Sequence, residues 1–437
     1  MKIDTNHSEY MFSVGGPRTR WIRAITLPTV LMVAASIAAA QPPVFRTLYS
    51  FTGLGDGASP SSLVIGGGGV LYGTTESGGS SNAGTVFSMT PPSSAGGSWT
   101  QTVLYNFTSV DGASASAIVA AESGGVLYGA TYYGGSAGSC SGGCGTVFSL
   151  TPPASSGANW TETALYNFTG GHDGRYPNSL ILKGGVLYGT TYLGGYAGIG
   201  VVFALRPPAI PGTAWTEEVL FHFAGFSEGG NPLSVAMGEG GVLYGTTGAS
   251  NLSNGTVFSL APPPSPGAWT HAVLYDSFAV AATPNYLAIG SGGAIYGTTV
   301  GGGTGSCDSG SGCGAVFSLT PPGSSGGAWT YTTLYSFTDS GDDGAYPYAG
   351  VAIGGGVLYG TTGLGGHGGN GYGTVYSLTP PASTGGAWTE TVLHQFTGTG
   401  DGAIPHIGVV IGGGGLLYGA TGFGGTGKDG TVYSVKP

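Results

Sequence analysis

The stretch Leu71-Tyr72-Gly73-Thr74-Thr75 recurs with small variations seven times along this chain of 437 residues. Its tyrosine returns at intervals of 56, 60, 56, 52, 63 and 59 residues, at Tyr72, Tyr128, Tyr188, Tyr244, Tyr296, Tyr359 and Tyr418. Internal repeats with a period of tens of residues are typical of solenoids, propellers and other arrays. The chain is therefore expected to consist of seven copies of one supersecondary unit.

Each copy contains four short apolar runs separated by clusters of Gly, Pro and Ser. In the third copy these runs span residues 179–182, 186–191, 200–205 and 215–223. Such runs, rich in Val, Leu, Tyr, Phe and Thr, predict strands, and no segment after Gln41 shows helical periodicity. We therefore predict an all-β fold, a seven-bladed β-propeller with four antiparallel strands per blade, named A to D from the centre outward.

The two ends of the chain favour a propeller over a β-solenoid. The last copy stops after Gly430–Pro437, which matches strand C, and it lacks a strand D. Residues 44–51 match strand D of later copies, such as residues 100–107. The N-terminal strand is therefore predicted to join the C-terminal blade, which closes the ring and leaves no long unpaired edge.

Two residue types recur at fixed places in the repeat. A glycine follows the tyrosine in every copy, which predicts a position where backbones crowd toward the axis and no Cβ is tolerated: Gly73, Gly129, Gly189, Gly245, Gly297, Gly360 and Gly419. A tryptophan opens strand D in six copies, and we expect it to fill the outer gap between blades: Trp99, Trp160, Trp215, Trp269, Trp329 and Trp388.

The N-terminus reads as an export signal. Arg18, Arg20 and Arg23 precede an apolar run that ends in small residues before Gln41. Residues 1–40 are therefore predicted to be a cleaved signal peptide, and residues 41–437 a single propeller domain that does not insert into a membrane. The segment from Gln41 carries 6 basic and 18 acidic residues, a net charge of −12. This acidity predicts that the protein does not bind nucleic acid, because phosphate contacts need clustered Lys and Arg.

The repeat also resembles a known family. Runs such as Gly185–Thr191 and Gly145–Pro153 resemble the GloVer tandem repeat of exported bacterial proteins, over residues 44–437. Blade 5 departs most, since it reads Ala294-Ile295-Tyr296 and lacks the Asp-Gly turn of the other copies. The resemblance implies an exported repeat protein, with no established activity to carry over.

One face of the predicted ring is the candidate binding surface. The D-to-A and B-to-C connections share that face, and 11 of the 18 acidic residues fall in them. The candidate ligand-binding residues are those at or beside the recurrent acidic turn: Asp56, Asp111, Asp173, Glu228, Asp342, Asp343 and Asp401. The simpler interpretation of each Asp-Gly is a tight turn in which Asp bonds to the backbone.

Cofactors and metals receive little support from the sequence. The closest approach to a calcium loop is Asp339-Ser340-Gly341-Asp342-Asp343-Gly344, which lacks the dense acidic spacing of such loops, so no cofactor is predicted and calcium is a weak alternative. Cys140 and Cys144 share one Gly-rich loop, and Cys307 and Cys313 share the corresponding loop of blade 5. In an exported chain these pairs predict two local disulfides.

No nucleophile motif or metal-protease motif occurs, and the histidines after Gln41 occupy unrelated repeat positions. We therefore expect a secreted or periplasmic, non-enzymatic, monomeric propeller that binds a glycan or a surface protein through its acidic loop face. Two alternatives stay open at this stage. They are an extracellular enzyme acting on polysaccharide, with a carboxylate pair near the axis, and a passive structural module of the cell envelope.

Overall fold

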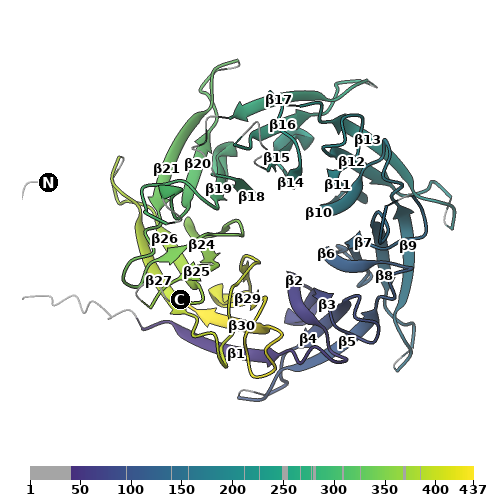
Figure 1. Cartoon of the computed structure of the whole chain (residues 1–437), viewed down its shortest axis with the longest axis horizontal. Helices are drawn as coiled ribbons and strands as arrows, with labels where there is room; N and C mark the ends of the chain where they lie inside the picture. Colours follow the sequence, from purple (N-terminus) through teal and green to yellow (C-terminus); the bar gives the residue numbers. More distant parts are fainter. Residues whose placement is uncertain are drawn as a thin grey trace, which may run out of the picture. The chain divides into compact units, whose positions relative to one another are not determined.

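The computed structural model describes residues 41–437 apart from residues 95, 139, 156, 211, 226, 249–253, 266, 277, 279–281, 308–309, 325, 368–370 and 384. The predicted signal peptide lies outside the described residues. Pro42–Pro437 form one structural unit. Its strands form a seven-bladed β-propeller, as predicted (Figure 1).

Each blade is a four-stranded antiparallel sheet in which sequence neighbours pair. The first three blades, in the order A to D, are β2 (Ala58–Ile65), β3 (Leu71–Ser77), β4 (Thr85–Thr90) and β5 (Thr100–Asn106); β6 (Ala113–Ala120), β7 (Leu127–Tyr133), β8 (Thr146–Thr151) and β9 (Thr161–Asn167); and β10 (Arg175–Lys183), β11 (Val186–Leu193), β12 (Val201–Arg206) and β13 (Thr216–His222).

Blades 4 to 6 are β14 (Pro232–Met237), β15 (Leu243–Thr247), β16 (Val257–Ala261) and β17 (Thr270–Tyr275); β18 (Pro284–Ile289), β19 (Ile295–Thr299), β20 (Ala315–Thr320) and β21 (Thr330–Ser336); and β23 (Ala352–Gly354), β24 (Val357–Thr362), β26 (Thr374–Thr379) and β27 (Thr389–Gln395). A short pair, β22 (Gly344–Ala345) with β25 (Leu364–Gly365), flanks blade 6. The only helices among the described residues are 3-10 turns, such as Gly67–Gly69.

Blade 7 confirms the predicted closure of the ring. It combines β28 (Val410–Ile411), β29 (Leu417–Thr421) and β30 (Thr431–Lys436) with β1 (Val44–Ser50) from the other end of the chain. β1 pairs antiparallel with β30 from Val44 opposite Lys436 to Ser50 opposite Thr431, so purple β1 lies beside yellow β30 in Figure 1. Closure turns the two strands that would otherwise be free edges into an ordinary blade.

Aromatic rings fill every interface between neighbouring blades. The phenylalanine that follows strand D packs edge-to-face on the ring at the third position of the next strand C, as Phe51 does on Phe87 with centroids 5.1 Å apart. The same contact recurs around the ring, and in blades 6 and 7 the second partner is Tyr376 or Tyr433. Each such pair stabilises the fold by about 0.5–1.5 kcal/mol beyond the contribution of the apolar area that it buries.

The tryptophans occupy the place predicted for them between blades. Trp160 of blade 2 meets Tyr72 of blade 1 in a T-shaped contact with centroids 6.2 Å apart. Equivalent contacts join five further pairs of neighbouring blades. The tyrosine that defines the repeat and the tryptophan of the next blade are therefore two halves of one structural contact.

The recurrent glycine is crowded by both strands that flank it. A Cβ on Gly189 would lie 2.5 Å from Cζ of Phe203 and 2.6 Å from the carbonyl oxygen of Ser179. Both atoms belong to the same blade, on the two strands that flank β11. The prediction that no Cβ fits is therefore confirmed, because the backbone of strand A and, in addition, the Phe203 ring of strand C occupy the place of a Cβ.

Candidate functional site

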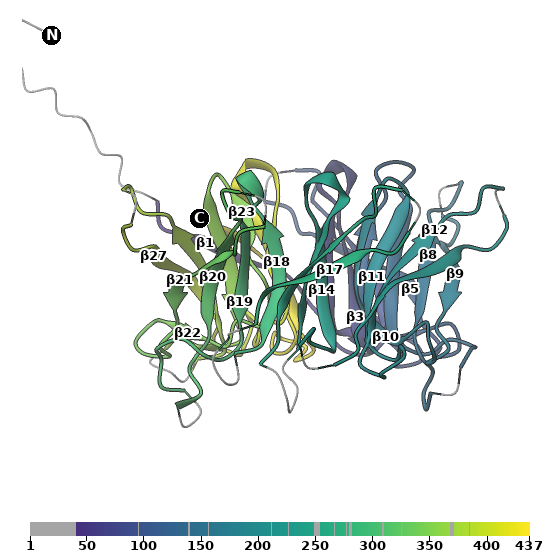
Figure 2. The ribbon, with the colours of Figure 1, turned by 90° about the horizontal axis from the view of Figure 1, so that it is seen from above.

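The D-to-A and B-to-C connections define one side of the ring, which we call the loop face. In Figure 2 these connections gather along the lower edge, where β22 is labelled. The A-to-B and C-to-D connections define the opposite side, the hairpin face. All seven candidate acidic residues lie on the loop face, as their place in the repeat requires.

Five of these acids bind the residues that precede them within the same loop. Asp173 is 8% exposed; its Oδ2 accepts hydrogen bonds from the Thr169 N–H (2.7 Å) and the Tyr166 hydroxyl (3.1 Å), and its Oδ1 accepts one from the Thr169 hydroxyl (2.6 Å). A threonine donates the same pair of bonds to Asp56, Asp111, Asp343 and Asp401. Both oxygens of these carboxylates therefore already have partners inside the loop, which is the geometry of a turn cap.

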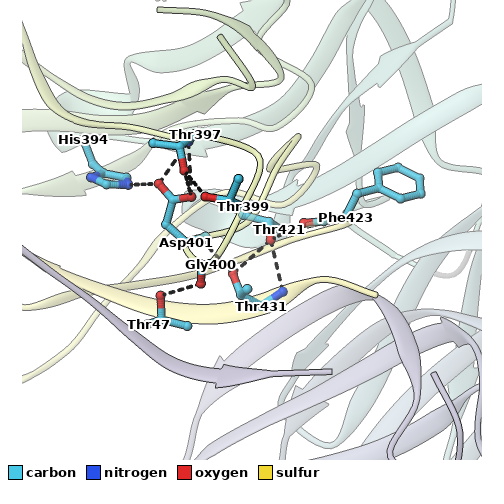
Figure 3. A network of polar contacts seen from close by, with 9 residues as sticks. All are labelled: Thr47, His394, Thr397, Thr399, Gly400, Asp401, Thr421, Phe423 and Thr431. Atoms are coloured by element: carbon cyan, nitrogen blue, oxygen red, sulfur yellow. Dashed lines mark hydrogen bonds and ion pairs between the residues drawn. The ribbon is translucent and has the colours of Figure 1, made fainter. Parts of the chain in front are cut away.

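Asp401 shows the same network at the closure of the ring (Figure 3). Its Oδ1 accepts a bond from the Thr397 hydroxyl (2.5 Å), and its Oδ2 lies 3.1 Å from Nε2 of His394. Burial lowers the pKa of His394, and Asp401 opposes that shift. The carbonyl of Asp401 also accepts a bond from Thr431 in blade 7 (3.2 Å), so this loop links two blades.

The other two candidates lie differently. Glu228 is half-buried and its Oε2 accepts a bond from the Ala224 N–H at 3.2 Å, a weaker version of the same cap. Asp342 is exposed. Asp339 of the same loop is half-buried; burial and the neighbouring Asp343 raise its pKa. Among the described residues, no group of three or more His, Cys, Asp or Glu lies close enough together to hold a metal ion.

Three glutamates near the loop aspartates were not among the candidates selected from the sequence. Glu162, Glu217 and Glu390 occupy the second position of strand D, and each has a buried Oε1 without a hydrogen-bond partner. Burial, followed by the charge of the nearest loop aspartate, raises the pKa of each to about 7. In blade 1 the same position carries Gln101, whose Nε2 donates to the carbonyl of Asp56 at 3.4 Å.

The large hydrophobic side chains that the loop face leaves exposed include five aromatic rings, beside the aliphatic Leu54, Val110 and Leu364. Among the described residues, five large aromatic side chains are exposed, and all five lie on this side, at the end of a strand B, in B-to-C connections or on strand A: Tyr133, Tyr196, Tyr286, Tyr372 and Phe423. Tyr196 is 72% exposed and packs between His172 and His222. Exposed aromatic rings of this kind mark recognition surfaces more often than scattered aliphatic residues do.

Blades 2 and 3 carry the densest aromatic group on this face. Tyr132 and Tyr176 stack with centroids 4.9 Å apart, and Tyr133 meets both of them edge-on. The guanidinium carbon of Arg175 lies 5.3 Å from the centroid of Tyr176. Tyr176 adopts a left-handed backbone with φ of 63°, as do the equivalent residues of five other blades: Ser59, Ser114, Asn231, Tyr346 and Ile404. A strained backbone at the start of strand A is thus a regular feature of the loop face.

A cavity of about 680 Å³ is lined by residues of strand A, or of the segment that leads into it, from all seven blades, and we call it the axial cavity. Glu76, Tyr286, Tyr348, His406 and Phe423 are among its lining residues. Desolvation by the surrounding protein raises the pKa of Glu76 and of Tyr286, although both side chains keep exposed surface, and burial lowers the pKa of His406. The sequence-based candidates included none of these residues, although Tyr286, Tyr348 and His406 each depart from the small residue found in most other copies.

A larger space of about 1000 Å³ opens on the hairpin face between blades 3 and 4. Its walls include Tyr188 and Trp269, one of the recurrent interblade pairs, and the ion pair of Arg206 with Glu218 at 2.9 Å, both 46% exposed. Because the same Tyr–Trp pair recurs between most blades, this groove is a by-product of blade packing and not a distinct site.

Both predicted disulfides form within their loops. Cys140 bonds to Cys144 and Cys307 bonds to Cys313. The sulfur atoms of Cys144 and Cys313 lie among buried residues, so each bond fixes a Gly-rich loop of the loop face against its own blade. No helix among the described residues is long and apolar enough to cross a membrane.

The comparisons with known proteins agree with this architecture. The family model of the Gloeobacter/Verrucomicrobia repeat matches residues 36–182, 138–309 and 248–437. No curated protein sequence matches the chain significantly.

Two solved structures share the fold at low sequence identity. A catalytically inactive virginiamycin B lyase from Staphylococcus aureus, solved with Quinupristin, has a TM-score of 0.55 at 12% identity; the match covers 90% of this chain and 99% of that one. The extracellular domain of a putative one-component system from B. thetaiotaomicron has a TM-score of 0.53 at 10% identity, over 90% of this chain and 41% of that one. Identities this low show a shared fold and nothing finer.

Proposed function

Because the chain belongs to the Gloeobacter/Verrucomicrobia repeat family and folds as a propeller, we propose that it is an exported binding protein that holds a carbohydrate chain on its loop face. One observation carries this proposal. All five exposed aromatic side chains among the described residues lie on that side of the ring. The predicted signal peptide and the two disulfides support export, since disulfides persist in oxidising compartments.

The chemistry of the exposed groups favours a glycan. A pyranose ring presents C–H groups on its faces and hydroxyls at its rim, so it can stack on an aromatic ring and pair with a tyrosine hydroxyl. Tyrosine also offers a large, rigid contact area at a small entropic cost. The net charge of −12 for residues 41–437 favours an uncharged polysaccharide over an anionic one.

Because most of the loop aspartates already cap a turn, we propose that they do not contact the ligand directly. Asp56, Asp111, Asp173 and Asp401 are engaged by neighbouring donors, so we propose that they shape the loops. In this proposal the exposed aromatics make the direct contacts. Asp342, which is exposed, is the acidic candidate best placed to contact a ligand itself.

An array of neutral polysaccharides and glycans tests this proposal, with the secreted protein as the probe and reducing ends assayed in parallel. The key variant replaces Tyr133, Tyr196 and Tyr372 by Ser. Loss of three stacking contacts should weaken binding by about tenfold or more, at about 0.5–1.5 kcal/mol per ring. The matched control is Ile210→Ser, because Ile210 is 68% exposed but lies on the hairpin face.

The outcomes separate the alternatives. Binding that the tyrosine variant loses and the Ile210→Ser variant keeps supports the proposal. Release of reducing ends favours an enzyme acting on polysaccharide. No binding to any glycan would refute the proposal and favour a surface-protein partner or a structural role.

A further inference from the structure

One position of strand A forms a clasp between neighbouring blades. Strand A contains a proline in blades 1, 3 and 5, and Ala115 takes its place in blade 2. The residue that follows is Ser or Asn, and its side chain donates a hydrogen bond to a backbone carbonyl near the start of strand A in the next blade. The bonds are Ser61 to Ala115 (2.6 Å), Ser116 to Pro177 (2.8 Å), Asn178 to Pro232 (2.9 Å) and Asn285 to Pro347 (3.1 Å). A small polar residue at this position therefore serves the ring itself.

Blades 6 and 7 replace this clasp by large rings. Tyr348 and His406 occupy the equivalent position, and both line the axial cavity. A threonine of strand B supplies an interblade bond between blades 6 and 7, since Thr361 donates to the carbonyl of Ile407 (3.2 Å). Thr298 of blade 5 donates in the same way to the carbonyl of Ala349 in blade 6 (2.8 Å), next to the clasp of Asn285. The interface between blades 6 and 7 therefore keeps an interblade hydrogen bond although Tyr348 occupies the clasp position.

A second substitution accompanies the first in both blades. A Cβ on Gly363 would lie 2.2 Å from Cε2 of Tyr348, and a Cβ on Gly422 would lie 2.5 Å from Cδ2 of His406. In the first three blades the position of these glycines carries Glu76, Tyr132 or Tyr192. The backbone thus leaves room for each ring at a place where blades 1, 2, 3 and 5 have a side chain, while blade 4 has Gly248 there.

The axial cavity is asymmetric as a result. Tyr286 of blade 5 is 43% exposed and Phe423 of blade 7 is 48% exposed, and both line the cavity with Tyr348 and His406. Blades 2 and 3 contribute small residues to the lining, such as Ser116 and Asn178. A ring of near-identical blades therefore holds one aromatic wall and one small-residue wall, which defines a single site per molecule.

The lining residues also limit the charge of a ligand. Glu76 is the only carboxylate among the described residues that line the cavity, and none of them is Lys or Arg. An anionic ligand would meet this carboxylate without a compensating cation, whereas hydroxyl groups find Ser, Asn, Tyr and His partners. A volume of about 680 Å³ lies in the usual range for small-molecule sites.

We propose that the axial cavity binds one uncharged pyranose, the terminal sugar of a glycan whose chain runs outward over the loop face. The ligand class rests on the proposed function, but the site is separate from the outer residues Tyr133, Tyr196 and Tyr372. Tyr286 and Phe423 present stacking surfaces, and Glu76 and His406 receive the sugar hydroxyls.

Titration of the full-length secreted protein with methyl glycosides tests this proposal by calorimetry and saturation-transfer NMR. The panel is methyl glucoside, methyl galactoside, methyl mannoside and N-acetylglucosamine, with glucosamine and glucuronate as charged probes. We expect at least one uncharged sugar to bind with a stoichiometry of one. Tyr286→Ala and Glu76→Gln should each weaken that binding severalfold or more, and Ile210→Ser should leave it unchanged.

Tyr286 and Glu76 are both exposed, so these variants should fold, and circular dichroism checks that they do. Binding of glucuronate as strong as that of the neutral sugars would overturn the proposal. So would a binding constant that neither variant changes, or silence of all uncharged sugars. Binding of glucosamine that exceeds the neutral sugars and needs Glu76 would also overturn it, in favour of a cationic ligand.

Polysaccharide binding is measured on the same samples. Sugar binding without polymer binding would refute the proposed function but support the axial site. Polymer binding without sugar binding would support the proposed function but refute the axial site.

Discussion

Replacing the three half-buried glutamates of strand D by glutamine should stabilise the protein at alkaline pH and leave its stability at acidic pH unchanged. Glu162, Glu217 and Glu390 have pKa values raised from 4.5 to about 7, chiefly by burial. The unfolded chain releases these protons near pH 4.5, but the folded chain keeps them until about pH 7. The folded state therefore binds more protons between these values, and its stability falls as the pH rises through this window.

The size of the effect follows from the same shift. A pKa raised from 4.5 to about 7 corresponds to about 3 kcal/mol between the protonation states, and partial exposure reduces this to about 1–2 kcal/mol per glutamate. Three glutamates then cost about 3–6 kcal/mol at pH 8. With an unfolding entropy of about 2.1 cal/mol/K per residue, a domain of this size gains about 4–7 °C in Tm when the cost is removed.

Glutamine suits this position because blade 1 already uses it. Gln101 occupies the equivalent place and its amide donates to the carbonyl of Asp56. The change also removes a carboxyl whose buried Oε1 has no partner. Glutamine should therefore fit without new strain.

Scanning calorimetry of the triple Glu→Gln variant and the parent at pH 4.5 and pH 8 measures the effect. Glu218→Gln is the matched control, since Glu218 lies beside Glu217 but is 46% exposed and pairs with Arg206. It should change stability by no more than about 1 kcal/mol. An equal gain in Tm at both pH values, or a loss at pH 8, would contradict the assignment of raised pKa values.

Other features of the ring give three further expectations. The double variant Tyr376→Phe and Tyr433→Phe should gain about 1 kcal/mol per site in urea unfolding, because both hydroxyls are buried without a partner and the other blades carry Phe; a loss would show that the hydroxyls have partners. Replacing both disulfides by serine pairs should cost about 2 kcal/mol per short loop yet keep the circular dichroism spectrum, and a collapsed spectrum would refute a local role. Deleting residues 41–51 should abolish cooperative unfolding of the ring, since β1 would no longer pair with β30; an unchanged Tm would show that closure is dispensable.

The sequence predicted most of the fold because each structural contact is repeated. The seven tyrosines and the glycines that follow them indicated the number of blades, and residues 44–51 indicated the closure. Strand A was the least accurate element. In blade 3 it was predicted from residue 179, but β10 begins at Arg175, because a bulge between Pro177 and Ser179 interrupts the alternating pattern.

The hydrogen-bond partners of single residues could not be predicted from one sequence. The threonine at the end of the motif illustrates the difficulty. Oγ1 of Thr75 accepts a bond from the N–H of Thr85 and donates to the carbonyl of Ser77, so a recurrent polar residue is buried for the backbone of its own blade. The spacing of the repeat gives the recurrence of such a residue but not its partner, which depends on the pairing register.

In a repeat protein, recurrence and function tend to separate, and the two classes of candidate residue illustrate why. Asp56, Asp111 and Asp173 recur because each blade needs the same turn cap, so their repetition is evidence of a shared structural task. A ligand that binds once per molecule needs the opposite, a place where the blades differ. Tyr348 and His406 differ from the clasp residues of blades 1, 2, 3 and 5, and Gly363 and Gly422 differ from the larger residues at their position in those blades. A substitution at one repeat position that is accompanied by a compensating substitution at a neighbouring position destabilises the fold little. Such positions are therefore where a propeller can acquire a binding site.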